Sequence, residues 1–172
     1  FFPSAALVTG LIIGLLNSPA NSFFILLIVI ALAISSKHFL RINHRPVLNP
    51  AAFGLFFGSL LLKTSVSWWG VASGMLPLLL LTGYVSIFRS RKLNIILSFF
   101  VVYNLLTFFI NKRTDIFDPV IIFFTLVMLP EPMTSSNRPN RQILFGIAAA
   151  VFTLMLSNNL ANIPDVLTGS LL

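Results

Sequence analysis

Apolar residues form long runs along the whole chain, and proline, glycine and charged residues separate these runs. The longest runs cover residues 22–35, 71–88, 93–110 and 143–156. They approach the roughly 20 residues that a helix needs to cross a bilayer. Strands of a membrane barrel would alternate polar and apolar residues, and these runs do not. The pattern therefore predicts α-helices, which satisfy their backbone hydrogen bonds internally.

The breaks between the runs predict seven or eight helical segments. We expect them at about 4–16, 22–36, 49–62, 70–88, 93–110, 117–130 and 142–158, with the start of an eighth near 164. Three of these segments are short for full spans and adjoin prolines, which is compatible with tilted, re-entrant or broken helices.

The composition indicates that these helices are embedded in a membrane. Apolar residues make up 57% of the chain, charged residues only 9%, and the mean hydropathy is +0.98. Soluble domains average about 25% charged residues, so a water-exposed surface cannot be built from this sequence. We therefore predict an all-α integral membrane protein, with a single membrane domain over residues 1–172. The start at Phe1 and the end within an apolar run suggest a fragment of a longer protein.

The absence of cysteine excludes disulfides, thiolate-held iron–sulfur clusters and cysteine zinc sites. The two histidines, His38 and His44, share one basic loop and are poorly placed to hold a haem between helices. We found no glycine-rich phosphate loop, no dinucleotide fingerprint and no nucleophile–base arrangement. Catalysis by side chains alone is therefore not expected, and whether the chain is an enzyme stays open.

The net charge of +7 is explained by membrane topology better than by nucleic acid. Eight of the eleven basic residues fall in three alternate loops: Lys37, Arg41, Arg45, Arg89, Arg91, Lys92, Arg138 and Arg141. Only Lys63, Lys112 and Arg113 fall in the others. Because cytoplasmic loops carry the excess of lysine and arginine, the three basic loops are predicted to be cytoplasmic. The expected location is the inner, or plasma, membrane.

A weak internal repeat is visible. The runs Thr9–Pro19 and Phe124–Pro132 both end in a polar, proline-bearing break, and each is followed by another span and a second proline-led helix start. Repeat one covers about 4–62, connecting helices about 70–110, and repeat two about 117–172. Because five spans separate their starts, the copies enter the membrane from opposite sides. Such inverted repeats place the ligand site near the midplane.

Three residues form the candidate cofactor-binding site: Asn49, which begins a proline-led helix, and Glu131 and Thr134, which lie at the second proline-bearing break. We expect them to face a shared cavity near the centre of the bundle. A carboxylate at the depth of Glu131 costs several kcal/mol unless it is paired or faces a cavity. Glu131 is therefore either a ligand-contacting or proton-handling group or an interfacial cap paired with Arg138 or Arg141. Asn49 is either a helix N-cap or a binding group, because the following Ala51, Ala52, Gly54 and Gly58 permit close approach of backbone or ligand.

Two further motifs have simpler structural interpretations. Asp118–Pro119 is typical of a helix start, with aspartate as N-cap and proline at the first helical position. Trp68 and Trp69 are expected to face the membrane interface as aromatic anchors.

Several blocks of the sequence resemble one membrane family in the same order. They are Ser4–Leu11, Ser36–Phe39 leading into Asn49–Gly54, and Glu131–Ser135 before Gln142–Gly146. The family contains the B subunit of sodium-translocating NADH:quinone reductase and the D subunit of the Rnf ferredoxin:NAD oxidoreductase. The likeness extends over almost the whole chain. The resemblance implies an inverted repeat of five helices. It also implies a role in electron transfer, with possible coupling to ion translocation, and FMN or riboflavin as cofactor.

The resemblance also implies partners. These are other membrane subunits and a soluble reductase domain or subunit that supplies electrons from NAD(P)H or ferredoxin, and the family implies no nucleic acid. The well-known members attach FMN through a threonine in a Ser-Gly-Ala-Thr motif, which this chain lacks, so any flavin is expected to be non-covalent. The alternative is a small-molecule or ion transporter or channel, since inverted repeats also suit a midplane pathway. A scaffold subunit without ligand is a third possibility.

Overall fold

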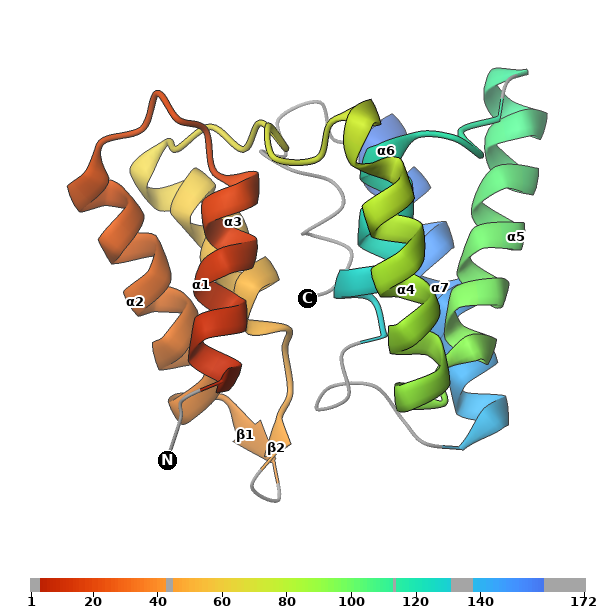
Figure 1. Ribbon diagram of the computed structural model, residues 1–172, viewed down its shortest axis with the longest axis horizontal. Helices are drawn as coiled ribbons and strands as arrows, with labels where there is room; N and C mark the ends of the chain where they lie inside the picture. The colour runs from red at the N-terminus through yellow and green to blue at the C-terminus, as the bar shows by residue number, and fades with distance from the viewer. Residues whose placement is uncertain (1–3, 43–44, 113, 131–137, 160–172) are drawn as a thin grey trace. The chain divides into compact units, whose positions relative to one another are not determined.

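The described residues of the computed structural model, 4–42, 45–112, 114–130 and 138–159, are mostly helical, which confirms the all-α class. Seven α-helices lie in this part of the chain (Figure 1): α1 (Ser4–Leu16), α2 (Phe23–Phe39), α3 (Pro50–Leu62), α4 (Leu76–Ser90), α5 (Leu93–Asn111), α6 (Pro119–Phe123) and α7 (Pro139–Asn159). The shorter elements are the strands β1 (Arg41–Ile42) and β2 (Arg45–Pro46), the 3₁₀ turn η1 (Ser73–Met75) and the π-helix η2 (Phe124–Met128).

Most helix boundaries lie within three residues of those predicted. With α6 and η2 counted as one helical segment, Pro119–Met128, the largest difference is at α4, which begins at Leu76 although a helix was expected from about 70. Residues 65–70 instead hydrogen bond to the end of α1, so they are not free to extend α4. The antiparallel pairing of β1 with β2 was not predicted, because two-residue strands leave no pattern in the sequence. The eighth predicted segment, from about 164, lies outside the described residues.

The chain forms two compact units. The first unit contains α1, α2, α3 and the β1–β2 hairpin, and the second unit, Ala72–Ala161, contains α4 to α7. Each is described by itself below. A single membrane domain built from two inverted repeats therefore stays a prediction.

In the first unit, α3 packs on α2 through its glycines. A Cβ atom on Gly54 would lie 2.7 Å from Ala33 Cβ and 2.8 Å from Val29 O, and one on Gly58 would lie 2.7 Å from Val29 Cγ2. A larger residue at either position would push the two helices apart. Two of the four small residues predicted to permit close approach of backbone or ligand, Gly54 and Gly58, thus lie against the neighbouring helix.

The second unit repeats this device between its two longest helices. A Cβ atom on Gly146 of α7 would lie 2.6 Å from Ile95 O and 3.0 Å from Phe99 N, both backbone atoms of α5. Small residues that let helix backbones approach closely are a common means of association where no water drives the helices together.

Polar side chains are buried in both units, and large apolar ones are exposed. Fully or nearly buried positions include Thr9, Asn17, Ser36, Ser59, Asn104, Thr107, Thr125, Gln142 and Thr153. The exposed stripe of α2 is Phe24, Leu27 and Ile28, whereas its buried stripe is Val29, Ala33 and Ser36. On α5, exposed Leu97, Val101 and Leu105 contrast with buried Asn104 and Thr107 in the same way.

Length and composition alone separate the helices into two groups. Leu93–Asn111 and Pro139–Leu156 are long and apolar enough to cross a membrane. Four apolar helices are shorter: Ala6–Leu16, Phe23–Phe39, Pro50–Leu62 and Pro119–Met128.

Candidate functional site

The first predicted site residue, Asn49, is the N-cap of α3. Its side chain is only 4% exposed, and its Oδ1 accepts a hydrogen bond from the backbone N–H of Ala52 at 3.1 Å. Pro50 occupies the first turn, where its missing N–H costs nothing. The capping interpretation of Asn49 is therefore confirmed, and its contact with a ligand stays a prediction.

The other two predicted site residues, Glu131 and Thr134, lie outside the described residues. The segment that leads to them is described up to Pro130, and Leu129 and Pro130 are buried in the second unit. The shared cavity proposed for Asn49, Glu131 and Thr134, and the alternative pairing of Glu131 with Arg138 or Arg141, both remain predictions.

A π-helix precedes this segment. The N–H of Leu129 donates to Phe124 O at 2.9 Å, five residues back, and the Thr125 hydroxyl donates to Ile121 O at 2.6 Å. A π-turn is rare and occurs frequently at functional sites. Sequence reasoning missed it, because one inserted residue in a continuous apolar run leaves the hydrophobic pattern unchanged.

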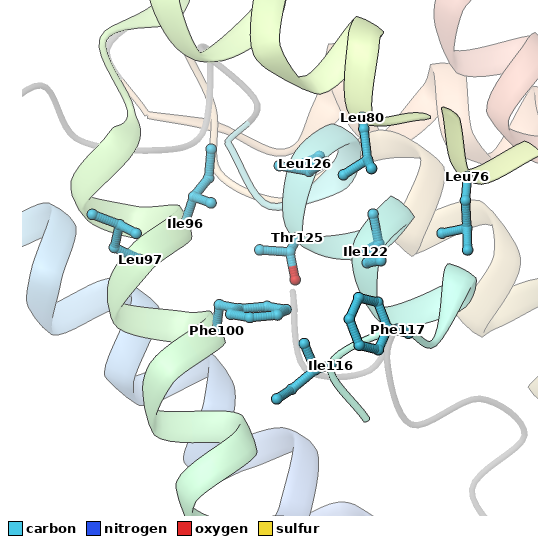
Figure 2. Close-up of a pocket in the computed structure, with 10 residues that line it drawn as sticks. All are labelled: Leu76, Leu80, Ile96, Leu97, Phe100, Ile116, Phe117, Ile122, Thr125 and Leu126. Carbon is cyan, nitrogen blue, oxygen red and sulfur yellow. The ribbon is translucent and has the colours of Figure 1, made fainter. Parts of the chain in front are cut away.

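The π-helix lines a cavity of about 260 Å³ in the second unit. Figure 2 shows the lining side chains, among which the Thr125 hydroxyl contributes the one oxygen drawn. The lining residues come from α4, α5, the loop before α6, α6 and η2: Leu76, Leu80, Ile96, Leu97, Phe100, Ile116, Phe117, Ile122, Thr125 and Leu126. Because the Thr125 hydroxyl already donates to its own helix, the cavity suits an alkyl chain or an unsubstituted ring.

Polar side chains near the end of α5 hydrogen bond to the loop that leads to two of the cavity residues. The Tyr103 hydroxyl donates to Asp115 Oδ2 at 3.4 Å, and the Asp115 N–H donates to Asn104 Oδ1 at 3.1 Å. Two cavity residues, Ile116 and Phe117, follow Asp115 directly. The two hydrogen bonds hold the loop that carries these cavity residues against the end of α5.

Asp118 is the N-cap of α6, as predicted. Its Oδ1 accepts a hydrogen bond from the Val120 N–H at 2.8 Å, and Pro119 begins the helix. This cap fixes the point at which the exposed loop turns into the buried α6.

The described cavity does not suit a flavin ring. An isoalloxazine carries several nitrogen and oxygen atoms along one edge, and buried polar atoms without hydrogen-bond partners are costly. The Thr125 hydroxyl is the one polar side-chain group of the lining, and it is already bonded. The cavity therefore gives no support to flavin binding, and the predicted flavin contacts of Asn49, Glu131 and Thr134 remain predictions.

The tryptophan pair has a structural role at the end of α1. Trp69 is 53% exposed, and its Nε1 donates to Gly14 O at 3.1 Å. The N–H groups of Ser67 and Gly70 donate to Leu16 O and Leu15 O, each at 3.0 Å. The loop thus satisfies carbonyl groups that a helix C-terminus leaves without intrahelical partners. The expected position of Trp68 and Trp69 at a membrane interface stays a prediction.

Within each unit, two loops that were predicted to lie on the same side of the membrane are joined by a hydrogen bond. In the second unit, Gln142 Nε2 of α7 donates to Arg91 O, between α4 and α5, at 3.3 Å. In the first unit, Asn21 Nδ2 donates to Ser65 O at 3.0 Å. This joins the α1–α2 turn to the loop after α3.

The chain matches no protein-family model, no curated protein and no solved structure.

Proposed function

We propose that the protein is an integral membrane protein whose helices cross or enter the bilayer. The observation that carries the proposal is the distribution of polarity, with hydroxyl and amide side chains buried and large apolar side chains exposed. In water, both the exposure of large apolar side chains and the burial of polar side chains would cost free energy. In lipid it is favourable, because apolar faces meet the acyl chains and buried hydroxyl groups donate to carbonyl groups of their own helices, as Thr125 and Thr153 do.

The basic residues supply the orientation. Arg91 and Lys92 precede α5, and Arg138 and Arg141 lie before and in the first turn of α7, at the end joined by the Gln142–Arg91 hydrogen bond. Lys112 lies at the opposite end of α5, about 28 Å away at 1.5 Å per residue. If the helices span the inner, or plasma, membrane as proposed, the end rich in lysine and arginine faces the cytoplasm.

Fractionation tests the membrane proposal. We expect the protein to stay in the membrane pellet after alkaline carbonate extraction and to be released by a mild detergent. Recovery of folded protein in the carbonate supernatant would contradict the proposal.

Within the membrane, the proposed role is that of a subunit of a flavin-dependent electron-transport complex. This role includes possible coupling of electron transfer to ion translocation. Its support is the ordered resemblance to the family named above, in which Asn49–Gly54 and Glu131–Ser135 fall in the two proposed repeats. The flavin would supply the redox chemistry, and the helices would supply position and a low-dielectric surrounding. A soluble reductase domain or subunit would supply the electrons.

A visible absorption spectrum of the detergent-purified protein tests the flavin. We expect the absorption band of oxidised flavin, and we expect the flavin to pass through a filter after acid denaturation, because the covalent attachment motif is missing. Fluorescence that stays with the denatured chain would contradict non-covalent binding. Purified folded protein without flavin absorption would favour the transporter or channel alternative.

A further inference from the structure

The β1–β2 hairpin at the end of α2 combines exposed apolar side chains with cations. Phe39 is 85% exposed and Ile42 66% exposed, and Leu40 is also exposed. Lys37 lies in the last turn of α2, and Arg41 begins β1. Exposed aromatic and aliphatic side chains beside lysine and arginine are typical of the zone between acyl chains and headgroups.

The arginine of this hairpin is held in place. Arg41 Nη2 lies 3.0 Å from His38 Nδ1, and Arg41 Nε donates to the carbonyl oxygen of Lys37. Val47 N–H donates to Leu40 O at 3.1 Å, which returns the chain toward α3. The guanidinium therefore lies next to the end of α2, close to Lys37.

The sequence offers these cations few carboxylates. Residues 1–114 contain no aspartate or glutamate, and the four acidic residues of the chain are Asp115, Asp118, Glu131 and Asp165. The hairpin segment 37–45 contains Lys37, Arg41 and Arg45. A net charge of +3 over nine residues, histidines neutral, favours an anionic partner.

The short helices of the first unit favour flanking residues that lie at the depth of the headgroups. Helices α1 and α3 have 13 residues each, or about 20 Å at 1.5 Å per residue, against roughly 30 Å of hydrocarbon. Phe39, the last residue of α2, and Leu40 and Ile42 beyond it extend the apolar surface of the first unit. Short apolar helices are otherwise accommodated by thinning of the bilayer or by flanking residues that reach the interface.

We propose that the β1–β2 hairpin binds the anionic phospholipid headgroups of the cytoplasmic leaflet, with Lys37 and Arg41 contacting phosphate and Phe39 and Ile42 inserted between the lipids. The hairpin thereby anchors the first unit at the cytoplasmic surface. This inference rests on the membrane location proposed above and is independent of flavin.

The absence of cysteine allows a direct test. The Ile42→Cys variant is labelled with an environment-sensitive fluorophore and placed in nanodiscs of phosphatidylcholine, alone or with added phosphatidylglycerol. We expect stronger quenching by a lipid-attached nitroxide, and weaker quenching by iodide, when phosphatidylglycerol is present. High salt should reduce the difference.

Matched variants separate charge from insertion. Lys37→Gln and Arg41→Gln should each lower the ratio of inserted to free hairpin about fivefold in phosphatidylglycerol discs, the factor that corresponds to about 1 kcal/mol per cation. Phe39→Ser should weaken insertion in both lipids. Lys63→Gln, in the loop at the other end of the first unit, is the control and should change nothing at Ile42→Cys.

Three outcomes would overturn the proposal. One is equal quenching of the label in the two lipids. Another is a label that stays accessible to iodide in both lipids, which would indicate that the hairpin binds a soluble partner instead. The third is that inorganic phosphate and soluble sulfate, compared at fixed ionic strength, displace the hairpin from the lipid equally well. That result would indicate that the hairpin recognises free anions. If the membrane location itself is wrong, the protein fails to enter the nanodiscs, and that failure is distinct from all three.

Discussion

In the first unit, helices of 13 and 17 residues pack backbone against backbone, whereas α5 and α7 of the second unit have 19 and 21 residues. The second unit also contains a π-helix and the cavity beside it. Both units use glycine at one close helix pair, but in the second unit the turn at η2 interrupts regular packing. The comparison separates a closely packed region, suited to anchoring, from one with space for an apolar group.

The largest expected effect is at the closest contact of the first unit. Gly54→Leu would place a side chain against Val29 O, a backbone atom that cannot move aside without separating α2 from α3. We expect a loss of about 3 kcal/mol in the free energy of unfolding, measured by SDS titration followed by far-UV circular dichroism in detergent micelles. Gly10→Leu is the control, because a Cβ atom at Gly10 meets no atom within 4 Å. Equal losses for the two variants would refute the packing of α3 on α2.

Two adjacent isoleucines of α5 test whether the cavity gives the second unit spare volume. Ile95 is completely buried where α5 meets α7, and Ile96 lines the cavity. Ile95→Phe should cost about 2 kcal/mol through overpacking, whereas Ile96→Phe should cost less than about 1 kcal/mol because the larger ring fills existing space. The same unfolding titration measures both. A larger cost at Ile96 than at Ile95 would show that the cavity does not exist in solution.

The smallest effects are expected at the two helix caps. Asn49→Ala and Asp118→Ala each remove one acceptor for a helix N–H, and each should cost about 1 kcal/mol. Asn49→Ser keeps a capping oxygen without burying a charge, and Asp118→Asn also keeps one, so these variants are the matched controls in the unfolding titration. If Asn49 also contacts a flavin, Asn49→Ala should in addition lower the flavin content of the purified protein. Unchanged stability in both alanine variants would argue against the capping geometry.

The sequence predicts the helices better than it predicts the cavity. Helix positions follow from apolar runs and from proline and aspartate signals, and the caps at Asn49 and Asp118 were recognisable because they combine a capping residue with proline. The cavity depends on the π-turn at η2 and on the approach of Phe117 to α4 and α5. These features arise from tertiary packing and leave no periodic pattern. Glu131 and Thr134 illustrate a third case, since their place in the sequence is clear and their environment is undescribed.

The β1–β2 hairpin illustrates how composition and structure complement each other. The sequence shows lysine and arginine in the loop after α2 and predicts a cytoplasmic location. The sequence does not show that Phe39 and Ile42 are exposed beside these cations, because an apolar residue near a helix end can be either buried or exposed. Only the side-chain positions identify the hairpin as a surface that combines both kinds of group.

Cysteine accessibility in intact cells tests the central claim, that both units cross the membrane with their basic ends in the cytoplasm. The natural chain has no cysteine, so single substitutions report cleanly. At the basic ends we choose His38→Cys and Asn140→Cys, and at the opposite ends Ser65→Cys and Thr114→Cys, all at exposed positions. The account predicts that an impermeant thiol reagent labels Ser65→Cys and Thr114→Cys in intact cells, and labels His38→Cys and Asn140→Cys only after permeabilisation. Equal labelling of all four, or labelling of His38→Cys and Thr114→Cys from the same side, would contradict it.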